Sequence, residues 1–229
     1  MKIEVAEFWT NDLEQMQDFY ARRLGLAVVE RSPMRLELQV GRSHLVIQEM
    51  DSAQAGHYHI AWDVPENQFP AALAWLKERT QPAANTDGQT LFNFPAWNAD
   101  SVYFADPDGN ILELIARHNQ PNAATADFSA NSLLAVSEFG IASQDVLDTV
   151  HNLCSLLHVE LYDGAGSDTF SAVGDEEGLL IVVKRGRIWL PGTGKPADYV
   201  PFCIQVKSAA GKAFQINGPV FPLGVHQTA

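Results

Sequence analysis

The sequence has few positive charges and lacks a long apolar run. Its 15 Lys and Arg residues against 28 Asp and Glu give a formal net charge of -13. A nucleic-acid backbone would be repelled by such a chain, so nucleic acid is not an expected partner. The apolar runs are short, and the one from Leu179 to Val183, for example, ends at Lys184. A membrane-spanning helix needs about 20 apolar residues, so we expect a soluble protein that does not enter a membrane.

Cysteine is also scarce. Cys154 and Cys203 form no close pair and each lies among apolar neighbours, so we expect two buried free thiols. Near the N-terminus, Glu4 and Glu7 interrupt the segment that a signal peptide would need to be apolar. The expected location is therefore cytoplasmic.

What the sequence does contain is a repeated order of elements. Residues 3–9 alternate in type as a strand does, and residues 13–24 carry apolar side chains at helical spacing. Three short strand patterns follow, at Ala27 to Arg31, Arg35 to Val40 and His44 to Glu49. This order predicts a βαβββ module.

The same order returns twice. The second copy has a strand at residues 57–64, a helix from Phe69 to Leu76 and a hairpin whose strands flank the turn residues Asp106 to Asn110. Residues 119–131 lack periodicity and indicate a linker. A third copy begins with a strand at Val136 and continues with a helix from Val146 to Leu157. Its further strand patterns are Val159 to Asp163, Thr169 to Val173 and Leu179 to Lys184.

After the third copy, Pro201 to Val206 predicts one more strand, and the tail beyond it shows no clear pattern. We therefore expect an α+β fold of repeated βαβββ modules, three in the chain.

Two segments carry a family resemblance. HIAWDV at residues 59–64 and YFADPDGNILELIAR at residues 103–117 resemble the vicinal oxygen chelate superfamily, which contains glyoxalases, bleomycin-resistance proteins and ring-cleaving (extradiol) dioxygenases. The resemblance implies paired modules whose mixed sheet curls around a cleft. It implies a glyoxalase-like domain of two modules at 1–118, a linker at 119–131, and a third module with a terminal strand and an irregular tail at 132–229.

Members of this superfamily bind a divalent metal through the first and last strands of their modules. The resemblance places the family's histidine at His59 and its glutamate at Glu113. The corresponding positions of the first module hold Val5 and Val46, which cannot bind a metal. In the third module the opening position holds Glu138, which has a ligating side chain.

Strand alternation gives an independent argument. Glu113 lies on the opposite strand face from Leu112 and Leu114, so its carboxylate is expected to be partly enclosed. Enclosing a carboxylate is costly unless a metal, a cation or hydrogen-bond donors compensate. An imidazole such as that of His59, together with a carboxylate, suits Fe, Mn, Zn, Ni or Co. His57, on the same predicted face as His59, is the expected further metal ligand.

Other residues remain open as ligands or catalytic groups. Gln48, Glu7 and Glu138 are alternative third ligands, and Glu7, Glu138 and Glu113 are candidates for the catalytic acid or base. Alternatively, His59 and Glu113 form a hydrogen-bonded pair in a metal-free cleft. The residues expected to contact substrate are Trp9, Gln48, Phe92, Phe94, Trp97 and Tyr103, although core packing also explains the aromatic ones.

Two functions follow from these observations. The first is a divalent-metal-dependent lyase, isomerase or ring-cleaving oxygenase that acts on a small molecule with vicinal oxygens. The second is a metal-free protein that sequesters a small molecule, as bleomycin-resistance proteins do. Because modules pair and three is an odd number, an unpaired module would expose its sheet, and we expect a homodimer.

Overall fold

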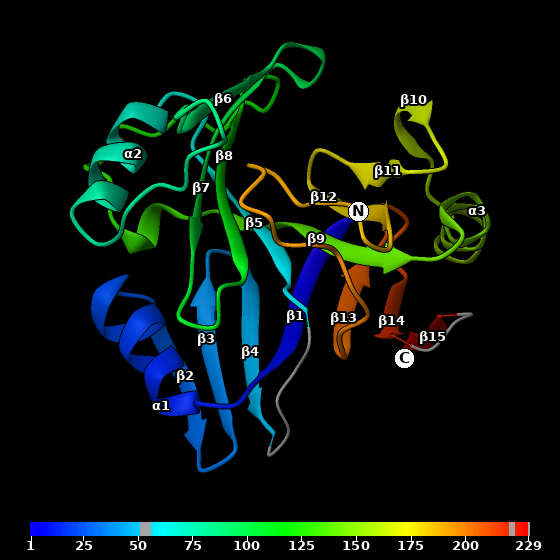
Figure 1. Ribbon diagram of the computed structural model, residues 1–229, viewed down its shortest axis with the longest axis horizontal. Coiled ribbons are helices and arrows are strands. Elements are labelled where there is room, and N and C mark those ends of the chain that lie inside the picture. The colour runs from blue at the N-terminus through cyan, green and yellow to red at the C-terminus, as the bar shows by residue number, and fades with distance from the viewer. Residues whose placement is uncertain (51–55, 220–222, 229) are drawn as a thin grey trace.

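The computed structural model describes residues 1–50, 56–219 and 223–228. Strands predominate and form two curled sheets, which lie in the lower and upper halves of Figure 1. The expected α+β class of repeated βαβββ modules is confirmed. None of the helices within the described residues is both long and apolar enough to cross a membrane.

The first module contains one helix that changes type along its length. Asp12 caps its start, because its side chain accepts a hydrogen bond of 2.9 Å from the backbone N–H of Gln15. Gly25 follows its end with a φ of 84°, a conformation that glycine adopts readily. The elements are β1 (Lys2–Thr10), α1 (Leu13–Gln17) with a π-helical continuation (Asp18–Arg23), β2 (Ala27–Ser32), β3 (Arg35–Val40) and β4 (Ser43–Glu49).

The next two modules repeat this order, and the tail adds three strands. The second module has β5 (His59–Val64), α2 (Phe69–Lys77), β6 (Leu91–Phe94), β7 (Ala99–Ala105) and β8 (Ile111–Arg117). The third has β9 (Ala135–Ser143), α3 (Val146–Leu157), β10 (Leu161–Gly166), β11 (Phe170–Asp175) and β12 (Gly178–Lys184). The tail forms β13 (Phe202–Lys207), β14 (Ala213–Gly218) and β15 (Gly224–Thr228).

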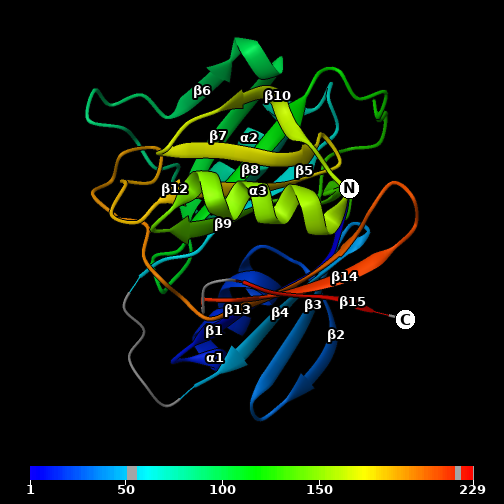
Figure 2. The same cartoon turned by 90° about the vertical axis from the view of Figure 1, so that its right-hand side faces the viewer.

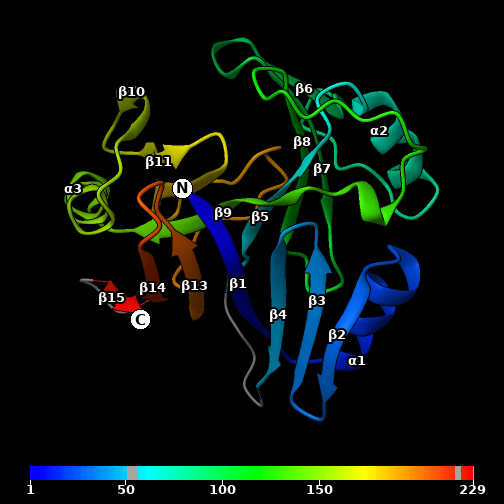
Figure 3. The ribbon, with the colours of Figure 1, turned by 180° about the vertical axis from the view of Figure 1, so that it is seen from behind.

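The sheets show which modules pair. The first sheet has the order β15-β14-β13-β1-β4-β3-β2, and the second has the order β10-β11-β12-β9-β5-β8-β7-β6. The second and third modules therefore share one sheet through the antiparallel pair β5 and β9. The first module is extended by the tail, since β13 pairs antiparallel with β1, as Figure 3 shows from behind. Among the described strands, every module therefore has a partner in its sheet. The odd number of modules is thus no longer a reason to expect a dimer.

The main core lies where one face of each sheet meets the other. Aromatic side chains cross this layer: the ring centres of Phe8 and Tyr58 are 5.1 Å apart, and those of Phe139 and Phe202 are 5.4 Å apart. Helix α3 packs on β11 and β12 (Figure 2). Because side chains alternate along a strand, burying one face in this core directs the polar residues of the second sheet to its other face. Both cysteines are free, as expected, but each is partly buried instead of fully buried, and Cys154 packs against the main core.

Candidate metal centre

Three side chains with metal-ligating groups meet on the outer face of the second sheet. His59 begins β5, Glu113 lies in the middle of β8, and Glu138 lies on β9. Strand β5 is flanked by both partners, and its residue Ala61 is opposite Glu113 on one side and Glu138 on the other. His59, two residues before Ala61, shares its face. The pairing of the second and third modules therefore brings all three groups together.

The geometry of this group fits a metal ion. The Nε2 atom of His59 is 3.6 Å from Oε2 of Glu113 and 3.6 Å from Oε2 of Glu138. One ligand atom from each of the three buried residues lies within 4.8 Å of the others. Zinc binds such atoms at about 2.0–2.2 Å, and in a tetrahedral arrangement these bonds place ligand atoms about 3.4 Å apart. Only small side-chain shifts are needed to bind an ion.

The charges around this group also favour a cation. Arg117, fully buried on β8, donates from Nη2 to Oε1 of Glu138, and its Nε lies 3.3 Å from Oδ1 of the equally buried Asp63. With His59 neutral, the carboxylates of Asp63, Glu113 and Glu138 outnumber the one guanidinium, which leaves an excess of two negative charges. Buried charge without compensation costs several kcal/mol per ion. One divalent cation would neutralise the excess.

The pKa values of the ligands show this imbalance. Burial, together with the negative charge of Glu138, raises the pKa of Glu113 to about 7. Burial also acts to raise the pKa of Glu138, but Arg117 and His59 outweigh it, so this pKa is lowered. Burial acts to lower the pKa of His59, but the hydrogen bond and charge of Glu138 and the charge of Glu113 outweigh it and raise this pKa. Glu113 and His59 therefore bind protons readily near neutral pH, and a metal would have to displace these protons.

A cavity of about 330 Å³ lies over the three ligands. Its floor contains His59, and the ring of Trp189 covers this imidazole with 5.2 Å between ring centres and 32° between ring planes. A Cβ at Gly140 would meet Cη2 of Trp189 at 2.6 Å, so the close approach of the indole requires glycine there. The cavity is lined by His59, Phe94, Pro95, Ala96, Trp97, Tyr103, Glu113, Glu138, Phe170, Ile181, Val183, Arg187, Ile188, Trp189 and Leu190.

Tyr103 adds a hydroxyl to this wall. Its ring centre is 6.3 Å from that of His59. Burial, followed by the charges of Glu113 and Glu138, raises the pKa of Tyr103 well above its ordinary value. The phenol therefore keeps its proton at neutral pH, where its hydroxyl hydrogen-bonds with Glu113.

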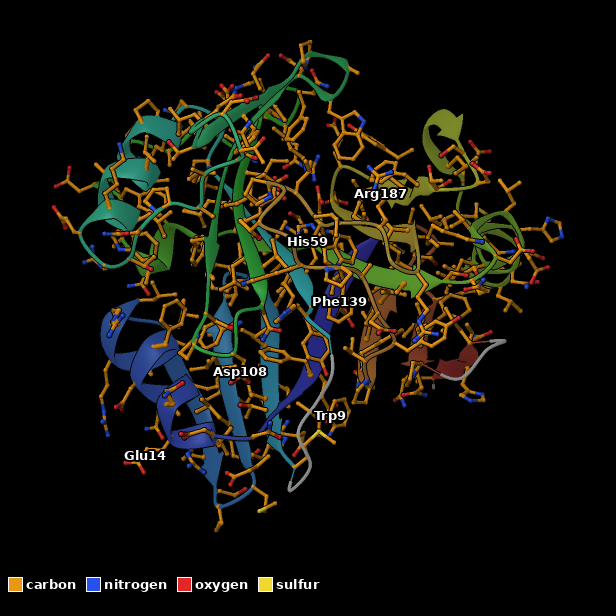
Figure 4. The ribbon with its side chains drawn as sticks, viewed as in Figure 1. Trp9, Glu14, His59, Asp108, Phe139 and Arg187 are labelled. Atoms are coloured by element: carbon orange, nitrogen blue, oxygen red, sulfur yellow. The ribbon has the colours of Figure 1, made fainter. Side chains whose placement is uncertain are left out.

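The residues predicted to contact substrate divide into two groups. Phe94, Trp97 and Tyr103 line the cavity, whereas Phe92 packs behind Tyr103 with 5.3 Å between ring centres. In Figure 4, Trp9 lies in the lower half of the molecule, while His59 lies in the upper half. Trp9 belongs to the first sheet, where it lines a separate small cavity of about 110 Å³.

Glu7 and Gln48 also lie on the first sheet, away from the three ligands. Gln48 donates a hydrogen bond of 2.7 Å from Nε2 to Oε1 of Glu7. His57 precedes β5 instead of belonging to it, so the alternation that predicted a shared face with His59 does not extend back to it. It lines the cavity of Trp9 instead. The metal-ligating and catalytic roles of these residues remain predictions.

Strand register explains which ligand positions are lost. In the second sheet Ala61 pairs with Glu113, and Gly140 pairs with Ile181 in the equivalent strands of the third module. Ile181 therefore occupies the position equivalent to Glu113, and a fourth ligand is replaced by an apolar side chain. In the first sheet, Glu7 pairs with Val46, which places Val46 at the position of Glu113.

Several residues of the site were not singled out from the sequence. Asp63 is on the same strand face as His59, and Arg117 on the same face as Glu113, so alternation alone was a usable signal for both. Trp189 and Arg187 lie in the segment after β12, which has no periodicity. Nothing in the sequence indicated that this segment covers the cavity.

Comparison with known proteins agrees with this architecture. Residues 2–114 match the model of the Glyoxalase/Bleomycin resistance protein/Dioxygenase superfamily. This part of the chain belongs to that superfamily, and the resemblance seen in the sequence is confirmed. No curated protein matches the chain significantly.

Solved structures resemble the whole chain. Glyoxalase I from Zea mays is 13% identical, with a TM-score of 0.52 over 95% of this chain and 88% of that one. A proposed dioxygenase from Bacillus subtilis subsp. subtilis str. 168 is 14% identical, with a TM-score of 0.57 over 95% of this chain and 84% of that one. At such low identity these likenesses show the fold alone.

Proposed function

We propose that the protein is a divalent-metal-dependent lyase, isomerase or ring-cleaving oxygenase that acts on a small molecule with vicinal oxygens. The observation that carries this proposal is the buried group of His59, Glu113 and Glu138 at the floor of a largely apolar cavity. One imidazole and two carboxylates suit Fe, Mn, Zn, Ni or Co. A divalent ion held there would supply Lewis acidity toward two adjacent substrate oxygens.

The protein's own residues would complete the chemistry. In the metal-free protein the pKa of Glu113 is about 7, so this carboxyl can release its proton near neutral pH and become available to a metal. Arg117 fixes the carboxylate of Glu138 by donating to one of its oxygens, which leaves the other oxygen toward His59. Trp189 covers the imidazole and limits the access of water. Tyr103, whose protonated hydroxyl hydrogen-bonds with Glu113, would orient that carboxylate.

A second function is favoured by a specific observation. Arg117 already compensates Glu138, and the raised pKa of His59 allows a proton to compensate Glu113. The same residues therefore support a metal-free cleft that sequesters a small molecule. The cytoplasmic location and the homodimer remain predictions that accompany either function.

Metal content distinguishes the two functions. The protein is purified without chelator or metal-affinity resin, and its metals are measured by mass spectrometry. About one equivalent of a transition metal is expected, with His59→Ala and Glu113→Ala losing it. Glu7→Ala, on the other sheet, is the matched control and should retain it. A wild-type protein that takes up no metal even on reconstitution contradicts the enzyme proposal and supports sequestration.

Proton competition gives a second readout. Because Glu113 must lose its proton to bind a metal and its pKa is about 7, metal affinity should fall as the pH is lowered through this range. Titration calorimetry with Co²⁺ in buffers of different ionisation enthalpy measures the protons released. Binding without proton release near neutral pH contradicts the assigned ligands.

A further inference from the structure

A cation stands at the mouth of the cavity without an acidic partner among the described side chains. Arg187 lies after β12, is exposed, and is the one Arg or Lys among the described residues that line the cavity. Its guanidinium carbon is 5.1 Å from the centre of the Phe170 ring. Within the described part of the chain, it forms no ion pair with an Asp or Glu side chain. By contrast, Arg185 pairs with Asp198, with 2.6 Å between Nε and Oδ1.

The backbone presents this side chain from a fixed position. The N–H of Arg187 donates to the carbonyl of Lys184 at 2.9 Å, and the carbonyl of Arg187 accepts from the N–H of Ala197 at 2.8 Å. These bonds fix the Cα of Arg187, and the contact with the Phe170 ring is what orients its guanidinium. In Figure 4, Arg187 and His59 both lie in the upper half of the molecule.

The space between the cation and the floor is suited to a planar apolar body. The rings of Phe94, Trp97, Phe170 and Trp189 line it. Its volume of about 330 Å³ is near the lower end of the roughly 300–1,000 Å³ typical of ligand pockets. A molecule of one or two aromatic rings fits this range.

Electrostatics determines which end of such a molecule faces the floor of the cavity and which end faces its mouth. Glu113 and Glu138 repel an anionic group from the floor, and the net charge of -13 gives no general attraction for anions. An unpaired guanidinium binds a carboxylate through two parallel hydrogen bonds. We propose that the cavity takes a small aromatic carboxylate, whose carboxylate is held by Arg187 at the mouth while its other end faces His59, Glu113 and Glu138. This substrate class deepens the proposed function. It rests on that function only for the end of the molecule that would react beside His59, Glu113 and Glu138.

The test compares a carboxylate with its neutral amide. Chelator-treated protein is titrated with 2-naphthoate and with 2-naphthamide by isothermal calorimetry. Water screens the attraction of an exposed guanidinium, so the wild type should bind the carboxylate about three- to fivefold more tightly than the amide. Arg187→Gln should remove this preference, and Arg187→Lys should retain part of it. Arg185→Gln is the matched control and should retain all of it.

Several results would overturn the inference. These are equal affinity for the two compounds in the wild type, a preference that survives Arg187→Gln, an equal loss in Arg185→Gln, or no binding of either compound. The outcome is separate from that of the proposed function, because the titration uses metal-free protein. A carboxylate preference without metal uptake would leave Arg187 as the anchor of a sequestering site. Metal uptake without the preference would refute the substrate class alone.

Discussion

Replacing Glu113 by Gln should stabilise the metal-free protein, and more so as the pH rises. Below its ordinary pKa of 4.5, Glu113 is protonated in both the folded and the unfolded chain. As the pH rises, the unfolded chain releases this proton first, so the folded state loses stability until the pH passes about 7. The difference between these pKa values corresponds to about 3 kcal/mol. Glu113→Gln removes this loss.

Urea unfolding of chelator-treated protein, followed by the fluorescence of the 5 tryptophans, measures the effect. Between about pH 5 and pH 8, the gain in unfolding free energy of Glu113→Gln over the wild type should grow by about 2 kcal/mol. Comparing two pH values cancels any constant cost of the substitution. Asp198→Asn is the control: its hydrogen bond with Arg185 holds the pKa of Asp198 low, so its difference from the wild type should stay flat. A flat difference for Glu113→Gln as well would refute the reasoning.

Three further substitutions test other parts of the site. Arg117→Met leaves Asp63 and Glu138 buried without their cation and should lower the unfolding free energy by about 3–5 kcal/mol in urea; a loss below about 1 kcal/mol contradicts this electrostatic role. Gly140→Ala should cost about 1–3 kcal/mol, because its Cβ would meet Cη2 of Trp189 at 2.6 Å and Cβ of His59 at 2.9 Å. The cost should shrink in a Trp189→Leu background, and an unchanged cost there argues against this clash. Ile181→His supplies the missing fourth ligand and should tighten Co²⁺ binding in calorimetry, whereas weaker binding would contradict the register argument.

Local patterns determined the modules. Apolar residues at helical spacing predicted the helix from Val146 to Leu157. Alternation predicted strands whose ends, in the majority of cases, lie within one or two residues of the observed ends. These signals are reliable because each strand or helix face must match its own period to reach the core. They also isolated His59 and Glu113, since each is a polar residue on a strand whose other face is apolar.

The pairing of modules was decided only by the tertiary structure. Hydrogen bonds between β5 and β9 bring Glu138 to His59, and those between β1 and β13 keep Glu7 and Gln48 on the other sheet. Backbone hydrogen bonds carry no sequence code, so the partner of an edge strand depends on how whole modules pack.

The sequence by itself thus determined the superfamily resemblance, the repeated module and two residues of the candidate site. The tertiary structure decided the third ligand, the buried Arg117 beneath it, and the segment that places Trp189 and Arg187 over the cavity. The physical reason is that strand and helix periods arise from neighbours along the chain, whereas a metal centre and its cavity require contacts between residues far apart in it. Glu138 and Arg117 are 21 residues apart in sequence, yet they form a buried ion pair.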